Sequence, residues 1–83
     1  MTEIIDVAEG VRVNPNIMGG APCIAGTRIP TSSASDLASA GFDVAGIMDE
    51  YPTLSVEQIA NALAWQFRPV AVRMDAIAKA SLS

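Results

Sequence analysis

Few side chains in this sequence are suited to catalysis. The 83 residues include no histidine and a single cysteine, Cys23. Histidine is the usual general acid or base near neutral pH, and Cys23 has no cation close to it in the sequence except Arg28. The neighbouring carboxylates Asp49 and Glu50 would point about 100° apart on a helix, so they do not form a paired acid site. We therefore expect a protein that is not an enzyme, with Cys23 as a buried apolar side chain.

The same composition argues against a metal or cofactor site. One cysteine without histidine supplies neither a Cys/His zinc site nor a disulfide framework. The glycines of the stretch 19–28 match neither the phosphate-binding loop nor the dinucleotide-binding spacing. We expect these glycines to permit turns in the backbone. The alternative is an enzyme or cofactor site within the same stretch.

The side chains with the clearest binding chemistry lie near the middle of the chain. Glutamine and asparagine amides pair with adenine, and arginine binds phosphate, so Gln58, Asn61 and Arg68 are candidate DNA contacts. On a helix over 55–67 they would point away from the apolar residues, together with Trp65. An exposed tryptophan is typical of a protein interface, and we expect Trp65 to contact a partner.

The elements that must position these residues follow from the apolar pattern. Alternating residues over 3–13 and an apolar run at 23–25 predict short strands. From Thr31 the period becomes helical, and a first helix is expected to end at Gly41. A second helix is expected over 43–50, capped at its start by an aspartate and ended by Tyr51-Pro52.

A third helix over 55–67 has the strongest signals. Ser55 and Gln58 match a capping box. Five apolar residues recur at helical spacing and form the stripe that we expect to be buried: Val56, Ile59, Ala60, Leu63 and Phe67. The four residues 51–54 join this helix to the preceding one. A connection of this length is typical of a DNA-binding helix-turn-helix and also of ordinary helical corners.

The segment 68–83 is expected to add a C-terminal helix to a domain formed by 1–67. Pro69 suits the first turn of a helix. The apolar face of this helix has no position in a three-helix core, so we expect it to bind a partner. The predicted partner-binding residues are Trp65, Val70, Met74, Ile77 and Leu82.

Charge and size limit the partners. The net charge is −4, and the cations are Arg12, Arg28, Arg68, Arg73 and Lys79. A single chain with so few cations would bind DNA weakly, so we expect a dimer or a complex with a partner protein. The sequence contains no apolar run of about 20 residues and begins without a basic signal segment, which favours a cytosolic protein.

The stretch 12–30 reads RVNPNIMGGAPCIAGTRIP. It resembles the signature of the small bacterial and archaeal family named domain of unknown function 433, especially at Gly26-Thr27-Arg28-Ile29-Pro30. Tyr51-Pro52-Thr53-Leu54 matches a later part of that signature, and the resemblance covers about residues 11–67. Ala21 and Ala25 stand where the family usually has lysine and arginine, which removes two cations from this loop.

The resemblance implies a mostly α, homeodomain-like helix-turn-helix with a short N-terminal β element. It also implies a similarity to VapB-type antitoxins, which are often encoded beside a toxin with a PIN-like ribonuclease fold. The expected partners are this toxin and operator DNA, in a homodimer or a hetero-oligomer with the toxin, and the expected DNA contacts are Gln58, Asn61, Arg68 and Arg28. An acidic antitoxin would complement a basic, RNA-cleaving toxin. The alternative is a protein–protein adaptor that does not bind DNA.

Overall fold

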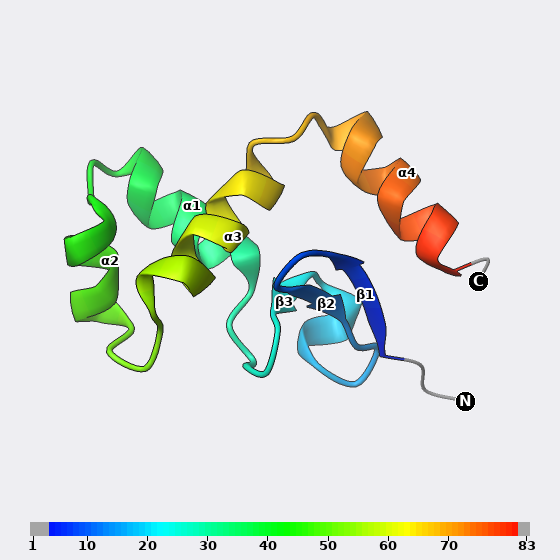
Figure 1. Ribbon diagram of the computed structural model, residues 1–83, viewed down its shortest axis with the longest axis horizontal. Coiled ribbons are helices and arrows are strands. Elements are labelled where there is room, and N and C mark those ends of the chain that lie inside the picture. The colour runs from blue at the N-terminus through cyan, green and yellow to red at the C-terminus, as the bar shows by residue number, and fades with distance from the viewer. Residues whose placement is uncertain (1–3, 82–83) are drawn as a thin grey trace.

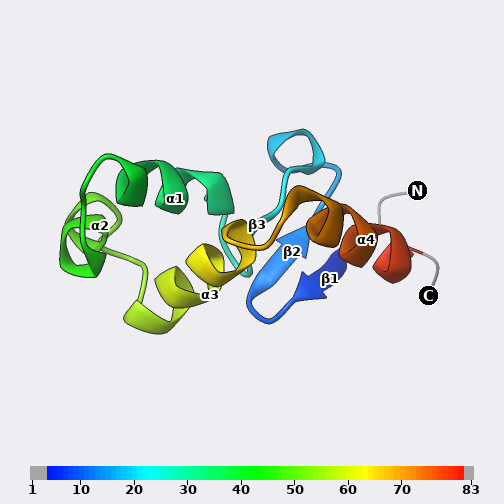
Figure 2. The same cartoon turned by 90° about the horizontal axis from the view of Figure 1, so that it is seen from above.

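The computed structural model describes residues 4–81 and shows four helices and a small antiparallel sheet (Figure 1). The elements are β1 (Ile5–Ala8), β2 (Val11–Val13), the 3-10 turn η1 (Met18–Gly20), β3 (Cys23–Ile24), α1 (Thr31–Ser39), α2 (Val44–Glu50), α3 (Val56–Gln66) and α4 (Val70–Ser81). Helices α1 to α3 lie at one end of the molecule, and the sheet and α4 lie at the other (Figures 1 and 2). The predicted mostly helical fold with an N-terminal β element is confirmed.

The sheet has the order β1-β2-β3, and each neighbouring pair is antiparallel. Residues 9 and 10 form the turn of the β1–β2 hairpin, and Arg12 on β2 lies opposite Cys23 on β3. Successive side chains of a strand point to opposite faces of the sheet. The buried Val11 and Ile24 mark the face that packs on the helices, so Arg12 and Cys23 belong to the outer face.

The helix ends agree with the sequence signals. Helix α1 ends in a Schellman motif, in which the Phe42 N–H donates to the Leu37 carbonyl at 3.0 Å and the Gly41 N–H to the Ala38 carbonyl at 3.1 Å. Gly41 has a φ of +98°, which explains why glycine stands there. Helix α2 is capped by Asp43, whose carboxylate accepts from the Gly46 N–H at 2.8 Å.

The hydrophobic core lies between α1, α2 and α3 and reaches the sheet through β3. Its fully buried members are Ile24, Ala34, Ile47, Leu54, Ile59 and Ala62. One polar contact joins the ends of two helices beside this core, because the buried Thr31 hydroxyl donates to Gln66 Oε1 at 2.8 Å. The same hydroxyl lies 3.3 Å from the Pro22 carbonyl oxygen, so Gln66 Oε1 is the nearer of its two acceptors. Gln66 therefore has a structural role on the covered side of α3.

The predicted buried stripe of α3 is wrong in its rotation about the helix axis. Val56 is 56% exposed, Phe67 at the C-cap is 73% exposed and Ala60 is also exposed. The fully buried residues of the helix are Ile59, Ala62 and Trp65. The buried arc is therefore turned from the predicted one by about 100°, which is one residue of a helix. The reason is that α3 packs against the sheet as well as against α1 and α2, so two of its flanks are covered.

Helix α4 lies outside the three-helix core and packs against β1, as both views show (Figures 1 and 2). The half-buried residues of α4 share one face and are Arg73, Ala76, Ile77 and Ala80. The predicted apolar stripe is thus divided, since Ile77 is half-buried while Val70 and Met74 are 61% and 65% exposed. Leu82 lies outside the described residues. None of the helices within 4–81 is long and apolar enough to cross a membrane.

Candidate functional site

Two helices present apolar side chains to solvent. On α3 and its C-cap, the exposed residues at helical spacing are Val56, Ala60, Ala64 and Phe67, and on α4 they are Val70, Met74 and Ala78. We call these seven residues the outer apolar faces. The outward side of α3 otherwise carries the carboxylate of Glu57. Large exposed apolar side chains on adjacent segments are typical of protein interaction sites.

The predicted DNA contacts do not gather on the outward side of α3. Asn61 is half-buried over the hairpin turn, where a Cβ built on Gly10 would come within 2.7 Å of Asn61 Nδ2. Gln58 is occupied in the capping box, because its Oε1 accepts from the Ser55 N–H at 2.8 Å. Arg68 lies at the other end of the helix with its guanidinium 5.4 Å from the centre of the Trp65 ring. The prediction that Asn61 projects from the outer face is therefore wrong.

The contact between Gly10 and Asn61 leads to a testable difference between two glycines. Gly10 and Gly26 have positive φ values of +71° and +81°, but a Cβ at Gly26 meets nothing within 4 Å. We expect Gly26→Ala to destabilise the fold by about 1 kcal/mol through φ alone. Gly10→Ala should destabilise it by at least about 1 kcal/mol more, because Asn61 must also move. Urea denaturation measures both values, and equal losses would contradict the described packing of Asn61.

Trp65 is buried, in contrast to the predicted exposed position. Its side chain is 1% exposed, and its indole Nε1 has no hydrogen-bond partner within the described part of the chain. Trp65 follows Asn61 by one helical turn, so it lies on the flank of α3 that faces the sheet. A side chain with this burial stabilises the domain and is not accessible to a partner. The prediction that an exposed Trp65 contacts a partner is wrong for this reason.

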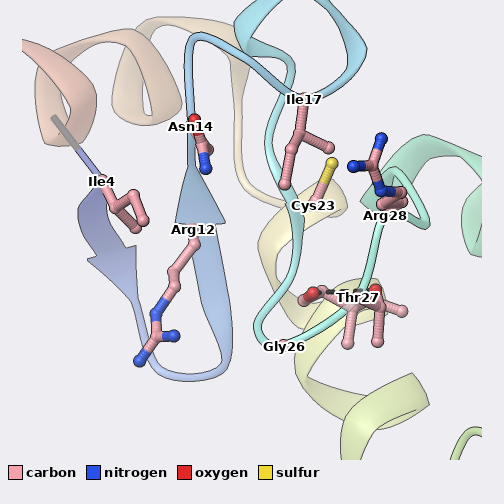
Figure 3. A pocket seen from close by; sticks show the side chains of 9 residues that line it. Ile4, Arg12, Asn14, Ile17, Cys23, Gly26, Thr27 and Arg28 are labelled. Atoms are coloured by element: carbon pink, nitrogen blue, oxygen red, sulfur yellow. Dashed lines mark hydrogen bonds between the residues drawn. The ribbon is translucent and has the colours of Figure 1, made fainter. Parts of the chain in front are cut away.

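The outer face of the sheet forms the floor of a pocket of about 330 Å³ (Figure 3). Arg12 and Asn14 border it from β2 and its end, while Arg28 borders it from the loop between β3 and α1 (Figure 3). Apolar and small residues complete the lining: Ile4, Ile17, Cys23, Ile24, Gly26 and Thr27. The stretch that resembles the family signature, 12–30, thus supplies all but one of the lining residues.

Two arginines border this pocket, and one of them is paired with a carboxylate. Arg12 Nε contacts Asp6 Oδ1 at 2.6 Å, and the other ion pair among residues 4–81 joins Lys79 and Asp75 on α4. Arg28 takes part in neither pair and is exposed. The cysteine in the wall adds no negative charge, because burial raises the pKa of the Cys23 thiol. The buried position expected for Cys23 is confirmed.

Sequence reasoning did not find the pocket, although part of the signal was present. Residues 12 and 14 are polar and alternate with the apolar Val11 and Val13, which marks a strand with two different faces. The loop 25–30 could not be placed from the sequence because its position depends on distant residues, as in the hydrogen bond from the Ala25 N–H to the Gly10 carbonyl at 2.9 Å. The glycines at 19 and 20 have positive φ, as expected for turn residues. In the described part of the chain, no group of three or more acidic, cysteine or histidine side chains could hold a metal ion.

The fold and these surfaces define a small helical domain with a helix-turn-helix corner, α2 to α3, and a hairpin element that covers one flank of α3. The chain belongs to the family described as protein of unknown function (DUF433), whose sequence profile matches residues 11–65. The family resemblance is thus confirmed.

The chain is similar to the uncharacterized protein y4eO of Sinorhizobium fredii (strain NBRC 101917 / NGR234). The two are 30% identical over 59 residues, which are 71% of this chain and 27% of y4eO. The matched part of this chain therefore spans about a quarter of that relative's length. No solved structure matches the chain.

Proposed function

We propose that this protein is the antitoxin of a type II toxin–antitoxin pair and that it neutralises a PIN-like ribonuclease by binding it. The observation that carries the proposal is the exposure of the outer apolar faces on α3 and α4. Val56, Phe67, Val70 and Met74 are all more than half exposed. Burial of such side chains against a partner contributes about 25 cal/mol per Å² of apolar surface, before the cost of ordering is subtracted.

The charge of the chain indicates the chemistry of the partner. Nine acidic residues and five basic ones give a net charge of −4. A nuclease that binds RNA must carry basic side chains around its active cleft. Opposite charges accelerate the encounter of two proteins and disfavour wrong partners. A basic ribonuclease therefore suits this acidic chain better than a neutral partner does.

In the proposed complex, α4 lies across the active cleft of the ribonuclease, with Val70 and Met74 in an apolar groove at the rim of that cleft. This helix packs against β1 outside the three-helix core, and its exposed apolar face is open to a partner. A helix of 12 residues is about 18 Å long, which is enough to cover an active cleft. Inhibition follows because RNA and α4 cannot occupy the cleft together. In this proposal the protein has no catalytic activity of its own.

Operator binding is a second proposal. It is favoured by the helix-turn-helix corner that α2, the connecting residues 51–55 and α3 form. In this proposal Gln58 Nε2, Arg28 and Arg68 supply the polar contacts, and two copies or the basic partner compensate for the acidic net charge. A mobility-shift assay on the chain's own promoter, at stated salt and with the partner present, tests it. Gln58→Ala and Arg68→Ala should each weaken the shift, and an unchanged shift in both would favour the adaptor function without DNA.

The antitoxin proposal is tested by co-expression with the ribonuclease encoded beside it. Cells that express the ribonuclease alone should stop growing, and cells that express both proteins should grow. A catalytically inactive form of the ribonuclease should co-purify with this chain in a fixed ratio. A neighbouring ribonuclease that remains toxic in the presence of this protein would contradict the proposal.

A further inference from the structure

The pocket on the outer face of the sheet is independent of the outer apolar faces, and its lining points to a ligand of its own. It holds about 330 Å³, which is at the lower end of the range for small-molecule sites. Among its lining residues there are two arginines and no carboxylate. Asp6, outside the lining, pairs with Arg12, so Arg28 supplies the positive charge that no ion pair within residues 4–81 neutralises. We propose that this pocket binds a small organic oxyanion, a carboxylate or phosphate ester carried on an apolar body.

Arg28 is the residue that we expect to bind the oxyanion. Its guanidinium is exposed at the pocket and belongs to neither of the ion pairs in the described part of the chain. A guanidinium binds a carboxylate or a phosphate with two parallel hydrogen bonds. Arg12 is the weaker candidate, because Asp6 already accepts from its Nε at 2.6 Å.

The loop that carries Arg28 is held in place before any ligand arrives. The Ile24 N–H donates to the Ile29 carbonyl at 2.9 Å, which closes the loop. Inside it, the Thr27 hydroxyl donates to the Ile24 carbonyl at 2.8 Å and accepts from the Ile29 N–H at 3.0 Å. A loop with these internal bonds loses little conformational freedom when it binds a ligand.

A second donor and an apolar wall complete the proposed site. Asn14 Oδ1 accepts from the Asn16 N–H at 2.9 Å, so the amide nitrogen of Asn14 remains as a donor, and Figure 3 shows it on the pocket side of the strand. Ile4 and Ile17 provide apolar surface on two sides of the pocket (Figure 3). An anion without an apolar body would leave these side chains in contact with water. The site therefore suits an organic anion better than an inorganic one.

The test uses the full chain, labelled with ¹⁵N, and four probes that differ in one property each. Benzoate and phenyl phosphate carry the two oxyanions on the same ring, benzamide is the neutral counterpart, and inorganic phosphate lacks the ring. We expect benzoate or phenyl phosphate to give saturable shifts of the Arg28 and Ile17 signals, with a Kd of about 1–10 mM, as is usual for so small a ligand. The tighter of the two identifies the oxyanion.

Substitutions decide whether Arg28 is responsible. Arg28→Gln should weaken binding of the tighter probe about tenfold or more, and Arg28→Lys should weaken it less, because lysine keeps the charge but loses the paired hydrogen bonds. Lys79→Gln on α4 makes the same change in net charge and should alter the Kd less than twofold. The proposal is overturned if neither anion saturates below about 50 mM, if benzamide binds as tightly as benzoate, if inorganic phosphate binds as tightly as phenyl phosphate, or if Arg28→Gln has no effect.

Discussion

Trp65→Ala is expected to destabilise the domain by about 3–5 kcal/mol, the largest loss from a single side chain in this protein. Trp65 is the largest fully buried side chain and is 1% exposed. Its removal leaves a cavity between α3 and the sheet, which the remaining side chains cannot fill. A domain of this size has a total stability of about 5–15 kcal/mol, so the variant should unfold partly or completely at 37 °C. Urea denaturation followed by circular dichroism measures the loss.

Phe67→Ala is the matched control, because it removes an aromatic side chain two residues further along the same segment. Phe67 is 73% exposed, and its removal should change the free energy of unfolding by less than about 0.5 kcal/mol. The sequence pattern alone predicts the reverse order, with Phe67 in the buried stripe and Trp65 outside. A larger loss for Phe67→Ala than for Trp65→Ala would therefore contradict the rotation of α3 in this structure.

Val70→Asp combined with Met74→Asp should abolish the binding of the proposed ribonuclease, with an affinity loss of about 100-fold or more. Both side chains lie on the exposed face of α4, and a carboxylate buried in an apolar groove loses its hydration without a partner. The fold should be retained, since the two positions are 61% and 65% exposed. Calorimetric titration with inactive ribonuclease gives the affinities of the wild type and the variant.

The control for this variant is Asn16→Asp combined with Ser32→Asp. Both positions are exposed and outside α4, and the change in net charge is the same. This control should bind the ribonuclease with nearly the wild-type affinity. If both double variants bind as the wild type does, the complex does not use the exposed face of α4. If both lose affinity equally, the loss is not specific to the exposed face of α4, and the proposed interface is contradicted.

The sequence was sufficient for the elements whose signals are local. The capping box at Ser55 and Gln58, the Asp43 cap and the terminating Gly41 each depend on a few neighbouring residues, and each is present in the structure. Strands and helices were therefore predicted close to their observed bounds.

The orientation of α3 could not be predicted in the same way, because it depends on contacts between distant segments. Asn61 and Gln66 are polar, which favours a solvent-facing side, yet they have partners at Gly10 and Thr31. These partners are 51 and 35 residues away along the chain. A hydrophobicity pattern counts both as surface residues, and Trp65 lies between them on the helix. Once both flanks of α3 are covered, the remaining outward side is the apolar one, which is the basis of the proposed interaction.

In the proposed function, the outer apolar face of α4 binds and inhibits a basic ribonuclease. The most direct measurement is the RNA-cleaving activity of the proposed ribonuclease partner, in purified form, as this chain is added. The wild type should inhibit cleavage completely at a one-to-one ratio, and Val70→Asp with Met74→Asp should leave cleavage at the uninhibited rate. Cleavage that is unaffected by the wild-type chain, or inhibited equally by the double variant, would contradict the account.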